Sequence, residues 1–292
     1  MTSARSTFRI GGDLEVGRLG FGAMRLATEP APARAASVAV ARRAVELGVT
    51  LIDTAYLYGG GANEELLVEA LHPYPADLLV TTKVGVSLPP GGEWRLDGRP
   101  DVLRAQVENA LRRLRVERIE LLQLHRVDPD VPLADQVGVL RELRDEGLIA
   151  RVGLSEVDAA QLDEARTIVD IASVQNRYSV LDREHEPVLA ACEAAGIAFL
   201  PWRPVAWGAA GDTPELAAVA REVDATPTQL ALAWLLARSP VLCPIPGTAS
   251  LPHLEENVAA QHVELSGTQR ERLDALAPQH GSTVARSAKP SS

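Results

Sequence analysis

Lysine is almost absent from this 292-residue sequence, which has 27 arginines but only two lysines. One of them, Lys289, lies in a polar tail, and the other, Lys83, follows an apolar run at residues 78–82. An ammonium is a compact charge whose pKa shifts readily on burial, whereas a guanidinium stays charged. The single lysine in the body of the chain therefore indicates chemistry at a strand end, with a structural ion pair as the alternative.

Other absences narrow the class of protein. The two cysteines, Cys192 and Cys243, are too far apart for a disulfide framework or a metal-ligand spacing. The sequence has no H-E-x-x-H pattern, P-loop or G-x-S-x-G motif. Gly20 and Gly22 lack the third glycine of a dinucleotide fingerprint. These absences argue against a metal site, a serine hydrolase and a Rossmann domain.

The composition is that of a globular protein, with 46% hydrophobic and 23% charged residues. A formal net charge of −10 argues against a nucleic-acid or anionic-membrane surface, because both polyanions would be repelled. Residues 1–9 contain no apolar signal region, and no apolar run is long enough to span a membrane. We therefore expect a cytoplasmic protein that binds neither nucleic acid nor membranes, and the sequence leaves its oligomeric state open.

Short apolar runs alternate with longer segments of helical periodicity along almost the whole chain. The predicted strands are residues 19–21, 51–52, 78–82, 119–124, 151–154, 172–175, 197–200 and 241–245. The predicted helices are residues 37–47, 64–71, 102–114, 133–146, 159–169, 186–195 and 226–237. Eight strand–helix units in an α/β chain are typical of a closed (β/α)8 TIM barrel, whose usual length is about 250 residues.

The remaining segments fit around such a barrel as one domain. Residues 8–16 read as an N-terminal hairpin that turns at Gly11-Gly12-Asp13, and the C-terminal part has room for extra helices. We expect a single barrel domain over residues 1–280, without an internal linker, and a disordered tail over residues 281–292. An open, doubly wound sheet is the alternative fold.

Polar residues stand at the carboxyl ends of the predicted strands, where the active sites of this fold lie. Asp53 ends the second strand, and Tyr58 lies in the loop that follows it. Lys83 ends the third strand, and His125 ends the fourth. We therefore expect these four side chains to meet at one mouth of the barrel.

Together these four residues are suited to deliver a proton to a carbonyl oxygen. A phenol has a pKa of about 10 and donates slowly near neutral pH unless a cation stabilises its phenolate. Lys83 is suited to be that cation, Asp53 would keep it charged, and His125 would orient a carbonyl by hydrogen bonding. Because no side chain donates hydride, a reduction requires a cofactor, and nicotinamide is the natural candidate.

Six short motifs resemble, in order, those of the aldo-keto reductases. They are Asp53-Thr-Ala-Tyr-Leu-Tyr58-Gly59, Thr82-Lys83, Leu124-His125, Gly153-Leu-Ser155, Gln175-Asn176-Arg-Tyr178 and Ile245-Pro-Gly-Thr248. The resemblance implies the barrel fold and the reversible, NAD(P)H-dependent reduction of an aldehyde or ketone. It also implies that Tyr58 is the general acid of a catalytic tetrad. Asp53, Lys83 and His125 complete that tetrad.

The same resemblance implies an extended nicotinamide dinucleotide. Ser155 and Gln175 would contact its carboxamide, and Trp202 would lie beneath its ring, where the family more often has tyrosine. Glu156 stands where the family usually has asparagine, so a carboxylate replaces an amide donor near the carboxamide pocket. The other cofactor positions that the resemblance implies are Arg203, Pro204, Gly247, Thr248, Ser250, His253, Glu256 and Asn257.

The phosphate-binding loop favours NADPH, with NADH as the alternative. Ala249 stands where many relatives carry a basic residue. Thr248, Ser250 and His253 remain able to hold a 2′-phosphate. This loop also resembles a branch that includes pyridoxal reductases, which implies a small aromatic or polar aldehyde as substrate. Two other functions stay open, a nucleotide-binding regulatory barrel and a Schiff-base aldolase that uses Lys83.

Overall fold

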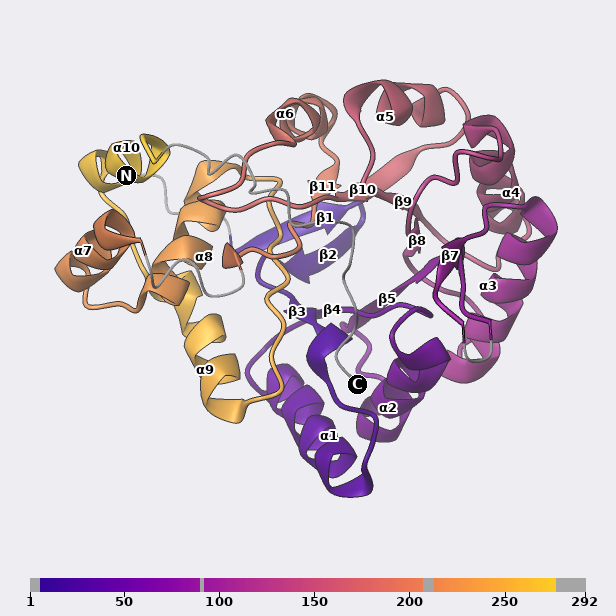
Figure 1. The fold of residues 1–292 in the computed structure, drawn as a ribbon, viewed down its shortest axis with the longest axis horizontal. Helices are drawn as coiled ribbons and strands as arrows, with labels where there is room; N and C mark the ends of the chain where they lie inside the picture. The colour runs from indigo at the N-terminus through magenta and orange to yellow at the C-terminus, as the bar shows by residue number, and fades with distance from the viewer. Residues whose placement is uncertain (1–5, 90–91, 207–212, 277–292) are drawn as a thin grey trace.

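The computed structural model describes residues 6–89, 92–206 and 213–276, and in these ranges seven parallel strands curve around a common axis inside a ring of helices (Figure 1). In sheet order the strands are β3 (Phe21–Gly22), β4 (Leu51–Asp53), β5 (Leu79–Val84), β8 (Leu122–Leu124), β9 (Val152–Ser155), β10 (Ile171–Gln175) and β11 (Ala198–Phe199). Each strand pairs in parallel with its neighbours, and a helix connects each to the next. The predicted alternation of strands and helices is therefore confirmed.

The barrel is closed by residues 241–246, which include the segment predicted as the eighth strand. Backbone hydrogen bonds join it to both edges of the sheet: Phe199 N to Val241 O (2.9 Å), Cys243 N to Phe199 O (2.8 Å), Gly20 N to Pro244 O (2.9 Å) and Gly22 N to Pro246 O (3.1 Å). Pro244 and Pro246 have no N–H, so they accept from the β3 side and donate nothing back. The segment therefore closes the barrel without forming a regular strand, and the predicted closed barrel is confirmed over the open sheet.

An antiparallel hairpin of β1 (Thr7–Ile10) and β2 (Leu14–Gly17) lies across one end of the barrel, as predicted (Figure 1). Ile10 and Val16 of the hairpin are fully buried in an apolar cluster with side chains from the strands. The other members, which come from the strands, from residues next to them and from the closing segment, are Leu51, Leu79, Leu121, Ala172, Ala198, Leu200, Cys243 and Ile245. Leu51 and Leu79 begin their strands, so the hairpin seals the amino-terminal end of the barrel interior. Each large aliphatic side chain buried there contributes about 1.5–3 kcal/mol.

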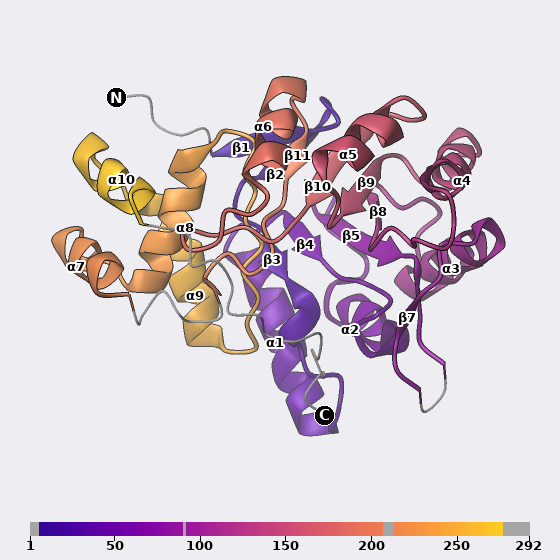
Figure 2. The same ribbon diagram turned by 45° about the horizontal axis from the view of Figure 1, so that its top comes forward.

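Helices cover the outside of the sheet (Figures 1 and 2). The described helices are α1 (Ala31–Glu46), α2 (Ala62–Leu71), α3 (Pro100–Leu114), α4 (Leu133–Asp145), α5 (Ala159–Arg166), α6 (Glu186–Ala195), α7 (Pro214–Glu222), α8 (Pro227–Arg238), α9 (Leu251–Ala259) and α10 (Gly267–Asp274), with short 3-10 turns at Ala23–Arg25, Gly59–Gly61 and Ala260–His262. Capping boxes begin α5, α8 and α10, and each satisfies otherwise unpaired N–H groups. The expected extra C-terminal helices are present as α9 and α10.

A second hairpin, of β6 (Val86–Ser87) and β7 (Arg95–Leu96), lies in the connection between β5 and α3. In Figure 2 its β7 strand lies toward the bottom of the view, whereas β1 of the N-terminal hairpin lies toward the top. The second hairpin therefore lies at the carboxyl end of β5, away from the N-terminal hairpin. The sequence predicted no strand there.

In the part of the chain that the structure describes, none of the helices has the length and apolar character needed to cross a membrane. The tail predicted at residues 281–292 and the domain boundary predicted at residue 280 lie outside the described residues.

Candidate active site

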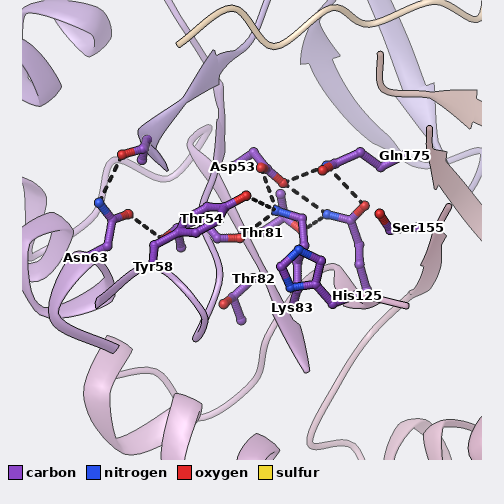
Figure 3. A network of polar contacts seen from close by, with 12 residues as sticks. Asp53, Thr54, Tyr58, Asn63, Thr81, Thr82, Lys83, His125, Ser155 and Gln175 are labelled. Atoms are coloured by element: carbon purple, nitrogen blue, oxygen red, sulfur yellow. Dashed lines mark hydrogen bonds and ion pairs between the residues drawn. The ribbon is translucent and has the colours of Figure 1, made fainter. Parts of the chain in front are cut away.

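Polar side chains gather at the carboxyl ends of five neighbouring strands (Figure 3). This end lies opposite the one that the N-terminal hairpin seals. Asp53 is the last residue of β4, and Lys83 is the last but one of β5. His125 directly follows β8. Ser155 and Gln175 are the last residues of β9 and β10. Because the carboxyl ends of parallel strands meet at one edge, the fold collects side chains that are up to 122 positions apart in the sequence.

Lys83 and Asp53 form a buried ion pair in which Lys83 Nζ lies 2.6 Å from Asp53 Oδ2, with side chains 0% and 3% exposed. Nζ also donates to Thr54 O (2.9 Å) and to the Tyr58 hydroxyl oxygen (3.3 Å). Burial alone would lower the pKa of Lys83, but the neighbouring carboxylate and phenol outweigh it and raise that pKa. Lys83 is therefore held as an ammonium whose three N–H groups all have acceptors.

Tyr58 lies in the loop between β4 and α2, which backbone hydrogen bonds hold in place. Tyr58 N donates to Ala55 O (3.1 Å), and Asn63 N donates to Tyr58 O (3.2 Å). Burial raises the pKa of the phenol, although the positive charge of Lys83 acts in the opposite direction. Because the phenol oxygen accepts from Lys83, its own O–H is left to donate to another group.

His125 is a buried, neutral imidazole beside the phenol. Its ring meets that of Tyr58 edge to face, with centroids 6.2 Å apart and an interplanar angle of 88°. Burial, followed by the positive charges of Lys83 and Arg126, holds the pKa of His125 well below its usual range. A neutral imidazole has one N–H donor, which suits it to orient a carbonyl oxygen.

Gln123 is part of the site, and the sequence analysis missed it. Its Nε2 donates to Asp53 Oδ1 (3.1 Å), and Gln175 Nε2 donates to the same oxygen (2.8 Å). Lys83 holds the other carboxylate oxygen, so both oxygens of Asp53 are fixed. The signal was present in the sequence, because Gln123 lies two residues before His125 and alternate strand residues face the same side.

The residues expected at the carboxamide and ring of a nicotinamide are Ser155, Gln175 and Trp202, and of these Gln175 contacts Asp53 directly. Ser155 is buried, and its Oγ accepts from Arg126 Nη1 (3.1 Å). The indole Nε1 of Trp202 donates to Glu156 Oε1 (2.5 Å), which also accepts from Arg177 N (2.8 Å). Glu156, which stands where the family usually has asparagine, therefore orients the indole of Trp202.

Two further expected cofactor residues follow Trp202. Arg203 has a left-handed backbone (φ 56°), and its Cζ lies 5.1 Å from the centroid of the Trp202 ring. Pro204 is buried. The guanidinium of Arg203 therefore packs against the ring of Trp202, and both residues lie in a short segment that follows β11.

The residues expected at the phosphates and adenine surround the start of α9. Thr248 Oγ1 accepts from Ser250 N (3.1 Å), and Ser250 precedes α9 without capping it through its side chain. The first turn of α9 also lacks acidic residues, so its N–H groups suit an anion. Asn257 is buried and His253 is exposed in the same helix.

Gly247 and Glu256 complete the expected set. A Cβ on Gly247 would lie 2.7 Å from Gly22 O, so only glycine fits this crossing beside β3. Glu256 Oε1 accepts from Thr226 Oγ1 (2.5 Å) at the start of α8, which ties α9 to α8. The uncapped helix start and the buried hydroxyl of Thr248 fit a phosphate-bearing dinucleotide.

The chain therefore combines a closed parallel barrel with a buried carboxylate–ammonium–phenol chain at the carboxyl ends of its strands, where the active sites of barrel enzymes lie. Residues 18–278 match the Aldo/keto reductase family, and the chain belongs to this family, as its motifs indicated. It is therefore an oxidoreductase. The chain is 45% identical over 269 residues to an uncharacterized oxidoreductase of Schizosaccharomyces pombe, covering 90% of this chain and 87% of the relative. It is 36% identical over 281 residues to pyridoxine 4-dehydrogenase of Escherichia coli, covering 93% and 98%.

Solved structures have the same architecture. An aldo-keto reductase from Bacillus halodurans, in a holo form, superimposes with a TM-score of 0.83 at 29% identity, covering 93% of this chain and 96% of the other. An aldo-keto reductase from Klebsiella pneumoniae, in complex with NADPH, has a TM-score of 0.82 at 27% identity, covering 95% and 96%.

Proposed function

We propose that this chain catalyses the reversible, NADPH-dependent reduction of an aldehyde or ketone to an alcohol, with Tyr58 as the proton donor. The observation that carries the proposal is the position of Lys83 Nζ, 2.6 Å from Asp53 Oδ2 and 3.3 Å from the Tyr58 oxygen. A cation at that point stabilises the phenolate that forms when the proton leaves.

The cofactor proposal rests on two features of the chain and on one relative. Trp202 offers an aromatic face, and the uncapped start of α9 offers N–H groups to phosphate. The Klebsiella pneumoniae structure contains NADPH. When bound, NADPH supplies the hydride. NADH remains the alternative, because exposed Ala249 provides no charge for a 2′-phosphate.

Each residue of the tetrad has a distinct task in this proposal. His125 donates its single N–H to the substrate carbonyl and orients it. Tyr58 donates its proton to the same oxygen as negative charge develops there. Lys83 stabilises the resulting phenolate, while Asp53 keeps Lys83 charged and in place. Gln123 and Gln175 fix the carboxylate of Asp53 from its other oxygen.

The proposed substrate is a small aldehyde of the pyridoxal type. The support is the 36% identity with pyridoxine 4-dehydrogenase, which spans nearly the whole of both chains. A Schiff-base aldolase is disfavoured, because the raised pKa of Lys83 and its three filled donors leave no free amine to attack a carbonyl.

Replacing the phenol oxygen tests the proposal directly. In Tyr58→Phe, kcat/KM for NADPH-dependent reduction of pyridoxal should fall about 10²- to 10⁴-fold, because the proton donor is lost. Binding of NADPH, measured by quenching of tryptophan fluorescence, should remain. Tyr56→Phe is a matched control in the same loop, since Tyr56 packs against Arg113 away from the tetrad, and it should retain activity. Near-wild-type turnover by a folded Tyr58→Phe protein would show that Tyr58 is not the donor.

A further inference from the structure

Arg126 lies within the active site, and the proposed mechanism does not use it. It directly follows His125, and its Nη1 donates to His125 O (2.6 Å) and to Ser155 Oγ (3.1 Å). Its Cζ lies 6.0 Å from the centroid of the Trp202 ring. The guanidinium therefore folds back across the mouth, between the tetrad and the residues expected at the cofactor.

Within the described ranges, this guanidinium has no carboxylate within ion-pair distance, and only one of its three nitrogens is hydrogen-bonded. Two other enclosed arginines have a carboxylate or several backbone carbonyls as partners. Arg113 is paired with Glu64 at 2.5 Å, and Arg18 donates to the carbonyls of Ser239 and Leu242, among others. Arg126 thus keeps Nε and Nη2 available, although a guanidinium presents two parallel donors that match a carboxylate or phosphate.

The charge of Arg126 reaches the reacting group. Burial raises the pKa of Tyr58, and the charges of Lys83 and then Arg126 oppose that increase. Burial also lowers the pKa of Arg126, as expected for a desolvated cation without a counter-ion in contact. The formal net charge of the chain is −10, so the protein as a whole repels anions. The positive charge of Arg126 attracts them locally.

We propose that Arg126 binds an anionic group of the substrate, so that the preferred substrates are aldehydes or ketones that carry a carboxylate or a phosphate. This inference rests on the proposed carbonyl reduction. A substrate group is favoured over a cofactor phosphate, because Arg126 touches His125 and Ser155 at the reacting end of the site. The segment suited to cofactor phosphates, at Thr248 and Ser250, lies at the start of α9 instead.

A matched pair of aldehydes tests the inference. 4-Carboxybenzaldehyde and 4-nitrobenzaldehyde have planar groups of similar size and differ in charge. Because the nitro group also activates the carbonyl toward hydride, each aldehyde is compared between the wild type and the variant. Arg126→Gln should lose about ten- to a hundredfold in kcat/KM for the carboxylate, mainly through KM. The nitro compound should change only a few fold. Arg126→Lys keeps the charge without the fork and should lose less than Arg126→Gln with the carboxylate. Arg104→Gln, in α3 where the guanidinium pairs with Glu142 and Glu146, removes an equal charge and should leave kcat/KM for both substrates unchanged.

Two outcomes would overturn the inference. Equal losses for both aldehydes would mean that Arg126 only positions the site. A parallel loss of NADPH affinity in Arg126→Gln would mean that its anion belongs to the cofactor.

Failure of the proposed function is separable from failure of this inference. If the wild-type chain reduces neither aldehyde, binding of 4-(hydroxymethyl)benzoate is measured by calorimetry instead. Lys83 also attracts anions, so only the binding lost in Arg126→Gln counts. Binding lost in that variant would support the anion site although carbonyl reduction had failed. Binding retained, or absent from the wild type, would overturn it.

Discussion

Leu51 and Asp53 are two residues apart in β4 and are both buried, yet they lie in opposite chemical surroundings. Leu51 packs with Ile10 and Val16 of the N-terminal hairpin in an apolar cluster. Asp53 receives hydrogen bonds from Lys83, Gln123 and Gln175. The same change occurs along β5, where Leu79 belongs to the apolar cluster and Lys83 to the polar one.

The comparison shows how this barrel separates stability from chemistry within one strand length. Buried ion pairs contribute little net stability, because desolvation opposes their attraction. The amino-terminal half is filled with aliphatic side chains and sealed by the hairpin, so it supplies the buried apolar surface that stabilises the barrel. The carboxyl-terminal half is then free to hold the charged pair of Lys83 and Asp53 beside the Tyr58 phenol.

The strongest way to break this separation is to place a charge in the apolar half. Leu51→Asp would bury a carboxylate without a hydrogen-bond donor, at a cost of several kcal/mol, and we expect it to abolish folding at pH 7. Circular dichroism and solubility measure this result. Leu51→Ala, the control, should cost about 2–5 kcal/mol and leave kcat unchanged, because it creates a cavity remote from the tetrad. A folded Leu51→Asp protein of normal stability would show that the two halves tolerate the same chemistry.

Removing the charge from the polar half should have a smaller effect on stability and a large one on activity. Lys83→Met leaves Asp53 without its cation. The free energy of unfolding, measured with urea, should therefore fall by about 3–5 kcal/mol. Residual activity should persist to higher pH than in the wild type. The pKa of Tyr58 is raised by burial and opposed by Lys83, so loss of the cation raises it further, and reduction needs the protonated phenol.

Leu79→Met is the control for that variant, since it places the same side chain at the other end of β5. A swap of similar volume should cost less than about 1.5 kcal/mol and leave the pH profile in place. If Lys83→Met kept the wild-type pH profile, Lys83 would not be coupled to the proton donor.

The sequence was sufficient for the barrel and for the meeting of the four tetrad side chains, because strand periodicity and strand-end position place them on one face. It was not sufficient for contacts that depend on side-chain direction. Gln123 was missed although its spacing from His125 marked it. Pro244 and Pro246 are plain in the sequence, but their effect appears only when the segment is seen to pair with β3.

Two other side-chain contacts become visible only in the folded chain. Glu156 has a left-handed backbone (φ 55°), a conformation in which asparagine is enriched, and this turns its carboxylate to the indole of Trp202. Arg126 reads in the sequence as an ordinary basic loop residue. Only the fold shows that its guanidinium turns back over Ser155.

The smallest expected effect is a pH dependence of stability that arises from His125. Burial, Lys83 and Arg126 lower the pKa of its imidazole in the folded state, whereas the unfolded pKa is about 6.5. Above pH 6.5 both states are neutral at this position, and the contribution is constant. As the pH falls below about 6.5, the unfolded chain binds a proton that the folded imidazole resists. Stability should then fall by at most about 1.4 kcal/mol per pH unit.

Urea unfolding of the wild type and of His125→Gln, between about pH 5 and 8, isolates this contribution, since other titrating groups are common to both. The difference between their free energies of unfolding should be constant above pH 6.5 and should change below it in the direction that favours His125→Gln. Parallel curves for the wild type and His125→Gln would mean that the imidazole accepts its proton as readily in the folded chain. The polar half would then be more open to water than its burial indicates, and the contrast with the sealed half would weaken.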